Sequence, residues 1–375
     1  MLHILHIIDS LCIGGAEKLL VTFAHVARER QLDVTVVSLR HAANTPIPGE
    51  LIQQGARVRL FHATKLLHLP RILQLTRFLQ QQSIDVVQTH LTSANIIGTL
   101  TGRLSKRPVV ATLHNTITDQ NVRHPMPHRL ETTALRYGAH HIVTVGHNVA
   151  QAHQNRAGPT PMSVVPNAVH SPPPLPLHER DAIRARLMGD ASRILLISVG
   201  SLTPQKGFTD LVEAFALLRK THPGAVLAIA GGGKLHDHLN THVRQLRLEG
   251  HVHLLGPRHD VPALLAASDV YVSSSHWEGL PVSILEAMAT GLPIVGTRVG
   301  DVADLVPTDS GILVAPKQPE ALARTLSSLC DDASRRHAYG AAGRAHVLQH
   351  YDANLWVNRL IAVYKEAQAS ADRPR

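Results

Sequence analysis

Two glutamates eight positions apart, Glu278 and Glu286, are the side chains of this sequence best placed to bind hydroxyl groups. They begin and end the segment EGLPVSILE. The apolar run before them, 270–272, predicts a buried strand that Gly279 and Pro281 bring to an end. Apolar residues at helical spacing follow. We therefore expect Glu278 in the loop at the carboxyl end of the strand and Glu286 about one to two turns into a helix.

The loop between the two glutamates also predicts an anion site. The backbone N–H groups of Gly279, Leu280, Val282 and Ser283, with Pro281 among them, would point out of the start of the helix. An anion such as phosphate is stabilised at such a position. Amides that bind a phosphate beside carboxylates that bind hydroxyl groups suit a nucleotide-sugar.

Residues at the ends of other predicted strands could add to this chemistry. Gly14 and Gly15 follow the first strand and open a helix, so their backbone could approach a phosphate, although a purely structural turn is an equally good interpretation. Lys206 follows the first strand of the second half and could act as a point charge on a diphosphate; a solvated loop lysine is the ordinary alternative. His114 ends an apolar strand, where a ligand contact is expected, although a lone histidine is more often inert.

Length and composition favour a protein of two domains. A chain of 375 residues exceeds one ordinary core and fits two domains of roughly 150–200 residues each. The apolar fraction is 44%, and no apolar run reaches the ~18 residues of a membrane-spanning helix. The apolar amino terminus lacks a basic head and predicts a strand rather than a signal peptide. Only Cys12 and Cys330 are present, which suits the reducing cytoplasm.

Charge and histidine content give weaker guidance. The net charge of +9 is compatible with nucleic acid, an anionic membrane surface or a phosphorylated substrate. Nucleic acid is the least favoured, because aromatic residues make up only 3% of the chain. The 27 histidines are scattered; the pairs His124/His128 and His236/His238 could in principle bind metal, but no cysteine lies near and prolines interrupt the first pair. We expect no metal site and histidines that lie mainly at the surface.

Short β-rich runs alternate with longer amphipathic ones, which predicts two parallel sheets with right-handed crossovers. The proline-rich segment 170–178 predicts a stiff linker. We expect one domain over residues 1–170, a second over 171–350, and a C-terminal helix over 351–375 that packs back on the first. Ligands of such folds bind at the carboxyl ends of the strands. The strands are expected at 3–8, 34–39, 58–61, 85–89, 109–113, 142–145, 163–165, 194–199, 226–230, 252–255, 270–273, 294–296 and 312–314.

In their order and spacing these positions closely resemble one family, the retaining glycosyltransferases of family 4. The resemblance covers nearly the whole chain. Its most specific part is the second domain, with Glu278, Glu286, the AMATGLPIVGT continuation and the loop at Lys206–Gly207. The segment GGAE at Gly14–Glu17 and the strand-end His114 also match. The resemblance implies the α/β GT-B fold, in which two Rossmann-like parallel-sheet domains face a central cleft, the first on the acceptor side and the second binding the nucleotide-sugar.

The resemblance also implies a role for each of these residues. Glu286 would bind the ribose hydroxyls of the donor nucleotide, and Glu278 with the amides after it would hold hydroxyls of the transferred sugar. Lys206 would neutralise the diphosphate, which Gly14–Gly15 would approach from the other domain. His114 would contact the donor sugar near the reacting carbon.

Two departures from the family pattern affect these roles. Relatives usually carry an arginine beside the diphosphate where this chain has Ser201, which leaves more of the leaving-group charge to Lys206. Arg258, at the end of a neighbouring strand, is a candidate substitute. Asn167 is followed by Ala168 rather than by the usual glycine, a change expected only to reshape a turn.

We therefore predict a cytoplasmic hexosyl- or N-acetylhexosaminyltransferase that acts in the synthesis of cell-surface polysaccharide or glycoconjugate. It would move a sugar from a nucleotide diphosphate donor, UDP-sugar being favoured, to a glycan or polyprenyl-linked acceptor with retention of configuration. No cofactor is expected, and no Asp-x-Asp element suggests a metal-bridged diphosphate. Two alternatives stay open. One is a non-catalytic sugar-nucleotide-binding scaffold, motivated by Ser201; the other is a GT-B sugar-nucleotide epimerase, which would need acid–base residues of its own.

We also expect the protein to lie on the inner face of a membrane without spanning it, since it is basic and many relatives act on lipid-linked acceptors. The run 65–79 could form a basic amphipathic helix that lies in an anionic interface. The alternative is a crossover helix packed on its own sheet. The expected apolar face consists of Leu69, Ile72, Leu73, Leu75 and Leu79, with Lys65, Arg71 and Arg77 beside it.

Overall fold

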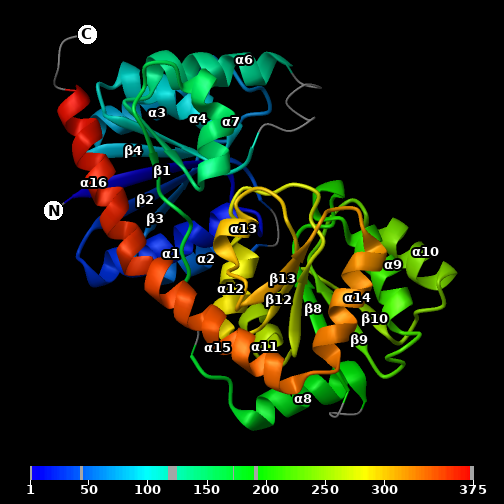
Figure 1. Ribbon diagram of the computed structural model, residues 1–375. Coiled ribbons are helices and arrows are strands. Elements are labelled where there is room, and N and C mark those ends of the chain that lie inside the picture. The colour runs from blue at the N-terminus through cyan, green and yellow to red at the C-terminus, as the bar shows by residue number, and fades with distance from the viewer. Residues whose placement is uncertain (1, 43–44, 117–124, 172, 190–192, 372–375) are drawn as a thin grey trace. The chain divides into compact units, whose positions relative to one another are not determined.

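The computed structural model describes residues 2–42, 45–116, 125–171, 173–189 and 193–371. Their contacts divide the chain into two compact units. Unit 1 consists of residues 1–168 together with 353–375, and unit 2 of residues 169–352. Each unit is described separately below (Figure 1).

Unit 1 is built on a parallel sheet of seven strands in the order β3-β2-β1-β4-β5-β6-β7. Apolar side chains from α3, α4 and the strands form a buried cluster on one face of the sheet. Figure 1 shows α3 and α4 above this sheet and α1 and α2 below it. The strands are β1 (His3–Ser10), β2 (Asp33–Arg40), β3 (Arg57–Leu60), β4 (Val86–His90), β5 (Val109–Leu113), β6 (His141–Thr144) and β7 (Met162–Val164). The helices are α1 (Gly15–Glu29), α2 (Ile47–Gln53), α3 (Leu69–Gln81), α4 (Thr92–Leu104), α6 (Pro125–Thr133), η1 (Ala134–Gly138), α7 (His147–Ala157) and α16 (Ala353–Ala371).

Unit 2 contains a parallel sheet of six strands in the order β10-β9-β8-β11-β12-β13. Its main apolar cluster lies between the strands and α9, α10 and α14, and Figure 1 shows α11 and α12 on the other side of the sheet. The strands are β8 (Leu195–Val199), β9 (Val226–Ala230), β10 (Val252–Gly256), β11 (Val270–Ser273), β12 (Ile294–Thr297) and β13 (Gly311–Val314). The helices are α8 (Leu177–Met188), η2 (Pro204–Lys206), α9 (Phe208–Leu218), α10 (His236–Gln245), α11 (Val261–Ala266), α12 (Val282–Thr290), α13 (Val302–Leu305), α14 (Pro319–Cys330) and α15 (Ala333–His350).

The expectation of two parallel-sheet domains is confirmed, and every expected strand is present within two residues of its expected ends. These strands are easy to recognise because a parallel sheet covered on both faces requires almost continuously apolar strands. The predicted linker overlaps a helix at its end, since α8 already begins at Leu177.

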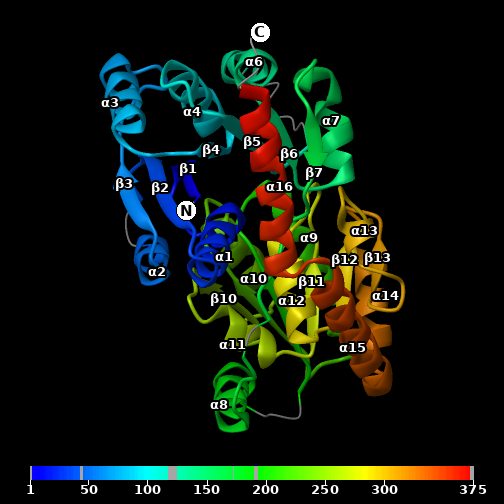
Figure 2. The same cartoon turned by 90° about the vertical axis from the view of Figure 1, so that its left-hand side faces the viewer.

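Helix α16 packs within unit 1. It contacts α1 and the strands β4, β5 and β6, and Figure 2 shows it lying across β5 and β6. The rings of Trp356 and Phe23 pack edge-to-face, with their centroids 5.9 Å apart. The hydroxyl of Tyr364 donates a hydrogen bond to Gln88, and both side chains are buried. The last helix therefore completes the face of the sheet on which α1 also lies.

The predicted amphipathic face of α3 is wrong in part. Ile72, Leu75 and Leu79 are buried in the cluster beneath the helix, as in an ordinary crossover helix. Arg71 is buried as well, and its guanidinium donates to the backbone carbonyl of Leu66. A smaller group of leucines is exposed to solvent at the start of α3 and just before it: Leu67, Leu69 and Leu73, which are 54%, 64% and 45% exposed. No helix in the described part of the chain is both long and apolar enough to cross a membrane.

The expectation of surface histidines is also wrong in part for unit 1. Histidines occupy core positions on its strands and helices, where hydrogen bonds to neighbouring groups offset the loss of water. The residues concerned are His3, His6, His90, His140, His141 and His153, all at most 6% exposed. His124, one of the candidate metal ligands, lies outside the described residues.

Candidate functional site

The carboxyl ends of β8 and β11 bring Lys206 and Glu278 together. These two strands are parallel neighbours, so the segments that follow them emerge at the same edge of the sheet. Lys206 ends η2, the short helix after β8, and Glu278 lies in the loop after β11. The Lys206 Nζ and Glu278 Oε1 atoms are 2.5 Å apart, and the two side chains are 18% and 5% exposed. An ion pair of this geometry combines charge attraction with a hydrogen bond.

Close backbone contacts fix the loop that carries Lys206. Gly207, which follows it, has φ +58°, in the left-handed region that favours glycine. A Cβ at Gly207 would lie 2.1 Å from the carbonyl oxygen of Ser274, so any side chain there would separate the two loops. Ser274 Oγ donates to the carbonyl of Lys206 at 2.8 Å, and His276 N–H donates to that of Gln205 at 2.7 Å. The lysine is thus attached to the glutamate loop by backbone as well as by charge.

Two further side chains hold the carboxylate of Glu278. Ser275 Oγ donates to Oε1 at 2.6 Å, the same oxygen that Lys206 contacts. Gln205 Nε2 donates to Oε2 at 3.3 Å and to the carbonyl of Trp277 at 3.1 Å. Both carboxylate oxygens therefore have donors from the protein, which offset the loss of water at a side chain that is only 5% exposed.

The segment after Glu278 is held equally closely. The Asp301 N–H donates to the carbonyl of Gly279 at 3.1 Å. Gly300 has φ +51°, and a Cβ there would lie 2.1 Å from the carbonyl oxygen of Glu278. Thr297 Oγ1 donates to the carbonyl of Ser275 at 2.6 Å. Residues at the end of β12 and directly after it thus hold the glutamate loop in place.

Helix α12 begins directly after this loop and places Glu286 in its second turn. The carbonyl of Pro281 accepts the Ile284 N–H at 3.2 Å, so the N–H groups of Val282 and Ser283 belong to the first turn, where the helix supplies no acceptor. Glu286 is the fifth residue of the helix and is partly buried. The predicted arrangement of a loop glutamate, helix-start amides and a helix glutamate is therefore present.

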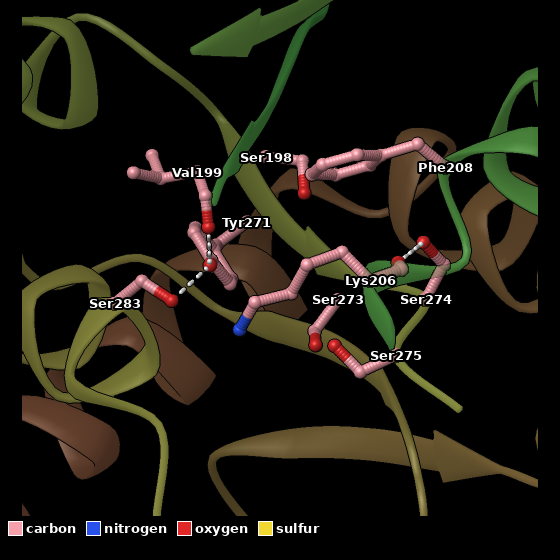
Figure 3. A pocket seen from close by; sticks show the side chains of 9 residues that line it. All are labelled: Ser198, Val199, Lys206, Phe208, Tyr271, Ser273, Ser274, Ser275 and Ser283. Atoms are coloured by element: carbon pink, nitrogen blue, oxygen red, sulfur yellow. Dashed lines mark hydrogen bonds between the residues drawn. The ribbon is translucent and has the colours of Figure 1, made fainter. Parts of the chain in front are cut away.

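A small polar pocket lies beside the Lys206 side chain (Figure 3). Tyr271 OH donates to Ser283 Oγ at 2.8 Å and lies 3.3 Å from the carbonyl oxygen of Val199. Burial raises the pKa of Tyr271, so its hydroxyl stays protonated and acts as a donor. The pocket is lined by Ser198, Val199, Lys206, Phe208, Tyr271, Ser273, Ser274, Ser275 and Ser283.

In unit 1, Gly14 and Gly15 lie at the start of α1, directly after β1. Gly14 has extended backbone, but a Cβ there would lie 2.5 Å from Oε2 of Glu17, so the glycine leaves room for that carboxylate. Burial, with the nearby charge of Asp9, raises the pKa of Glu17 to about 7. Asp9 accepts the Ala94 N–H of α4 at 2.7 Å, and burial raises its pKa as well. Unit 1 therefore has a partly buried carboxyl group at the end of β1, Asp9, near the buried carboxyl group of Glu17 in the first turn of α1. Asp9 was not among the site residues expected from the sequence.

His114 follows the last residue of β5 and is partly buried. Its Nε2 lies 3.1 Å from Nδ1 of His90, whose Nε2 lies 3.1 Å from Nδ1 of His6. Burial lowers the pKa of His114 to about 4, so the ring is neutral at pH 7. The expected position at a strand end is present, but the histidine is part of a row and not isolated.

Arg258 does not join the Lys206 pair. Its guanidinium makes two contacts with Asp260, at 2.8 and 2.5 Å. It follows β10, which is separated from β8 by β9. Ser201, at the position where relatives usually have an arginine, is exposed. Among the described residues, no three His, Cys, Asp or Glu side chains gather as a group that could hold a metal ion.

Comparison with known proteins places the two halves of the chain in one family. The model for Glycosyltransferase Family 4 matches residues 13–171, and that for Glycosyl transferases group 1 matches residues 179–346. The chain belongs to glycosyltransferase family 4.

Relatives agree with this assignment, and a solved structure shows the fold. The Escherichia coli UDP-Gal:alpha-D-GlcNAc-diphosphoundecaprenol alpha-1,3-galactosyltransferase is 29% identical over 266 residues, 68% of each chain. The Rhizobium meliloti lipopolysaccharide core biosynthesis glycosyltransferase LpsE is 35% identical over 154 residues, 41% of this chain and 44% of that protein. Anabaena HepE, solved with UDP and glucose, superposes with a TM-score of 0.86 at 22% identity over 97% of this chain and all of that one. The fold is GT-B.

Several residues of this candidate site were not identified from the sequence. Gln205 and Ser275 hold Glu278, and Tyr271 connects to the start of α12 through Ser283. The run of three serines at 273–275, which ends three positions before Glu278, was a usable signal, because consecutive hydroxyls at the end of an apolar strand need hydrogen-bond partners there. Gln205 carried no such signal, since its contact depends on the turn made by η2.

Proposed function

We propose that this family member transfers a sugar from a UDP-sugar to a hydroxyl group of a glycan or lipid-linked acceptor. The observation that carries the proposal is the contact of Lys206 with Glu278 beside the start of α12. A cation and helix-start amides suit a diphosphate, and two carboxylates suit sugar and ribose hydroxyls. The names of two similar proteins point the same way: one is a UDP-Gal-dependent galactosyltransferase, and the other was solved with UDP-glucose.

In this proposal Lys206 stabilises the leaving group. When the bond between the sugar and the diphosphate breaks, negative charge grows on the diphosphate, and a preorganised ammonium with backbone amides lowers the free energy of that state. Glu278, fixed by Ser275 and Gln205, holds the lysine in place and binds hydroxyls of the sugar. Glu286 binds the ribose.

We further propose a hexosyl or N-acetylhexosaminyl donor and retention of configuration, as the family resemblance implies. We nominate no nucleophile, so same-face attack and a covalent intermediate stay alternatives. The diphosphate is proposed to be bound without a divalent cation, because a lysine and helix-start amides already supply positive potential. Activity should then survive EDTA; loss of activity that Mg²⁺ or Mn²⁺ restores would contradict this part.

The acceptor is proposed to be membrane-linked, with the enzyme in the cytoplasm at the inner face of a membrane. The Escherichia coli relative is named for a diphosphoundecaprenol substrate. In unit 1 the exposed leucines Leu67, Leu69 and Leu73 lie next to the exposed Lys65 and Arg77. Apolar side chains beside basic ones suit an anionic interface.

One experiment tests the central proposal and its two alternatives. A panel of nucleotide-sugars is screened for thermal stabilisation, and the donor that binds is then incubated without acceptor. We expect selective stabilisation by UDP-sugars and slow release of UDP and free sugar. Binding with no turnover, with or without added acceptors, would favour a scaffold. Conversion of the donor into an epimer would favour an epimerase.

A further inference from the structure

Three histidines form a hydrogen-bonded row on neighbouring strands of unit 1. His6 lies within β1, His90 ends β4 and His114 follows β5. Both links have the same form: Nδ1 of the inner ring lies 3.1 Å from Nε2 of the next ring. Phe23 packs against His6 with ring centroids 4.6 Å apart, at the inner end of the row. The row therefore has a direction, from an apolar core to His114.

Each ring in the row is neutral at pH 7. Burial lowers the pKa of His6 to about 3, that of His114 to about 4, and that of His90 well below its ordinary value. A neutral imidazole carries hydrogen on only one of its two nitrogens. If neighbouring rings differed in tautomer, two N–H groups or two lone pairs would face each other across 3.1 Å, and the hydrogen bond would be lost. All three rings therefore share one tautomer.

The surroundings of His6, at the inner end of the row, determine which tautomer the three rings share. His6 Nε2 is buried, and no hydrogen-bond partner lies near it in the described part of the chain. A buried N–H without a partner is rarer in proteins than an acceptor without one. We therefore place no hydrogen on His6 Nε2. His6 Nδ1–H then donates to His90, and His90 Nδ1–H donates to His114.

We propose that His90 and His6 are positioning residues that hold His114 in its Nδ1–H form, so that His114 offers its substrate a hydrogen-bond donor. The inference rests on the proposed function, together with the contact between His114 and the donor sugar that the family resemblance implies. In this form the Nε2 lone pair of His114 is occupied by His90, and its Nδ1 already carries hydrogen. His114 is therefore a donor to a sugar oxygen and does not act as a general base.

The tautomer can be measured directly on the full chain labelled with ¹⁵N-histidine. Ring nitrogens with and without hydrogen resonate in well-separated ranges, and the signals of each ring are assigned from those lost in the His6→Leu, His90→Leu and His114→Leu variants. At pH 7 we expect hydrogen on Nδ1 in all three rings. Hydrogen on Nε2 of His114, different tautomers within the row, or a charged ring would each overturn the proposal. This measurement does not depend on activity, so it fails or succeeds separately from the proposed function.

Variants of His90 test whether the row acts on His114. Asparagine places its amide N–H near the position of Nδ1, so His90→Asn keeps the donor to His114, whereas His90→Leu removes it. With leucine we expect His114 to shift towards the Nε2–H form and kcat to fall about fivefold or more, the factor that one hydrogen bond supplies. With asparagine, tautomer and kcat should stay near wild type, as should the Kd for UDP in both variants. An unchanged tautomer in His90→Leu would overturn the proposal.

His141→Leu is the matched control. His141 is a buried histidine of β6, 4% exposed, whose Nε2 lies 2.9 Å from Ser163 Oγ and which is outside the row. Its replacement should lower the melting temperature as a buried polar substitution does, without altering the ¹⁵N signals of His114. A shift of those signals in His141→Leu as large as that in His90→Leu would show a general loss of packing and would overturn the role of the row.

Discussion

The two units share one design, a parallel sheet with helices on both faces, but they bury different polar groups. Among the described residues, unit 1 buries six histidines and unit 2 buries none. Unit 2 instead buries serine hydroxyls at the end of β11, next to the Lys206–Glu278 pair. The same edge of the same kind of sheet can thus be built either from neutral rings or from opposite charges. Under the proposed function, the negative charge of the diphosphate is therefore stabilised in unit 2.

The surroundings of these buried polar side chains explain how each is stabilised away from water. In unit 1, burial alone lowers the pKa values of His6 and His114. Unit 1 also buries one ion pair, in which Glu131 accepts from Arg156 at 2.7 Å and from Asn95 at 2.9 Å. In unit 2 the Glu278 carboxylate has three side-chain donors. A buried charge needs such partners, and a neutral imidazole needs fewer.

The largest effect should come from removing the cation of unit 2. Lys206→Ala should lower kcat by roughly two to three orders of magnitude, the scale on which one preorganised charge stabiliser acts. It also leaves the buried Glu278 without its charged partner, so the Kd for UDP and the melting temperature are measured alongside kcat. Lys220→Ala, an exposed lysine after α9, is the control and should be near wild type. If Lys206→Ala stayed active while Arg258→Ala lost activity, the diphosphate site would have to be placed elsewhere.

The two glutamates of unit 2 should separate binding from turnover. Glu286→Ala should weaken nucleotide binding about 10- to 100-fold, because ribose contacts are equally strong before and during the reaction. Glu278→Ala should reduce kcat more than it raises Kd, because contacts to the transferred sugar orient the reacting carbon. Both quantities are measured for both variants, and equal effects on Kd and kcat in the two would contradict the assignment.

The sequence predicted the two sheets and the positions of the two glutamates. It did not predict which polar side chains each unit buries. The strands of both sheets, the loop position of Glu278 and the helical position of Glu286 follow from apolar runs and from glycine and proline, which act locally. The histidine row was missed because His6, His90 and His114 are far apart in sequence, and strand order decides that β1, β4 and β5 are neighbours. The face of α3 was misjudged because periodicity marks an apolar stripe without saying what covers it. In this helix the sheet covers most of it.

Lowering the pH should destabilise unit 1 more than unit 2, because unit 1 contains the buried histidines. A buried neutral histidine has a lower pKa folded than unfolded, so below about pH 6.5 the unfolded chain binds more protons and stability falls as the pH falls. Between pH 6.5 and 5, His6 and His114 should each remove up to about 2 kcal/mol from unit 1. Glu17 and Asp9, whose pKa values are raised, act in the opposite direction and reduce the net loss.

Each unit contains one tryptophan, so the two stabilities can be followed separately. Trp356 reports on unit 1 in a Trp277→Phe variant, and Trp277 reports on unit 2 in a Trp356→Phe variant. Urea unfolding is followed by fluorescence from pH 7.5 down to pH 5. The midpoint for unit 1 should fall more than that for unit 2, and His6→Leu should make it less dependent on pH. Equal pH dependence in both units would contradict the link to buried histidines.

The smallest effect should be at the surface of unit 1. The double variant Leu69→Gln with Leu73→Gln should reduce binding to anionic vesicles about five- to tenfold, since each leucine only partly enters the interface and contributes on the order of half a kcal/mol or more. The control is Leu177→Gln in unit 2, which is 73% exposed compared with 64% for Leu69, and which should bind as wild type does. Co-sedimentation measures this with vesicles containing phosphatidylglycerol, and binding should weaken with salt because exposed charges are screened over about 8–10 Å.

If wild-type protein stayed in the supernatant at low salt, membrane association would be contradicted and a soluble acceptor favoured. If Leu177→Gln lost as much binding as the double variant, the attachment surface would not be specific to α3.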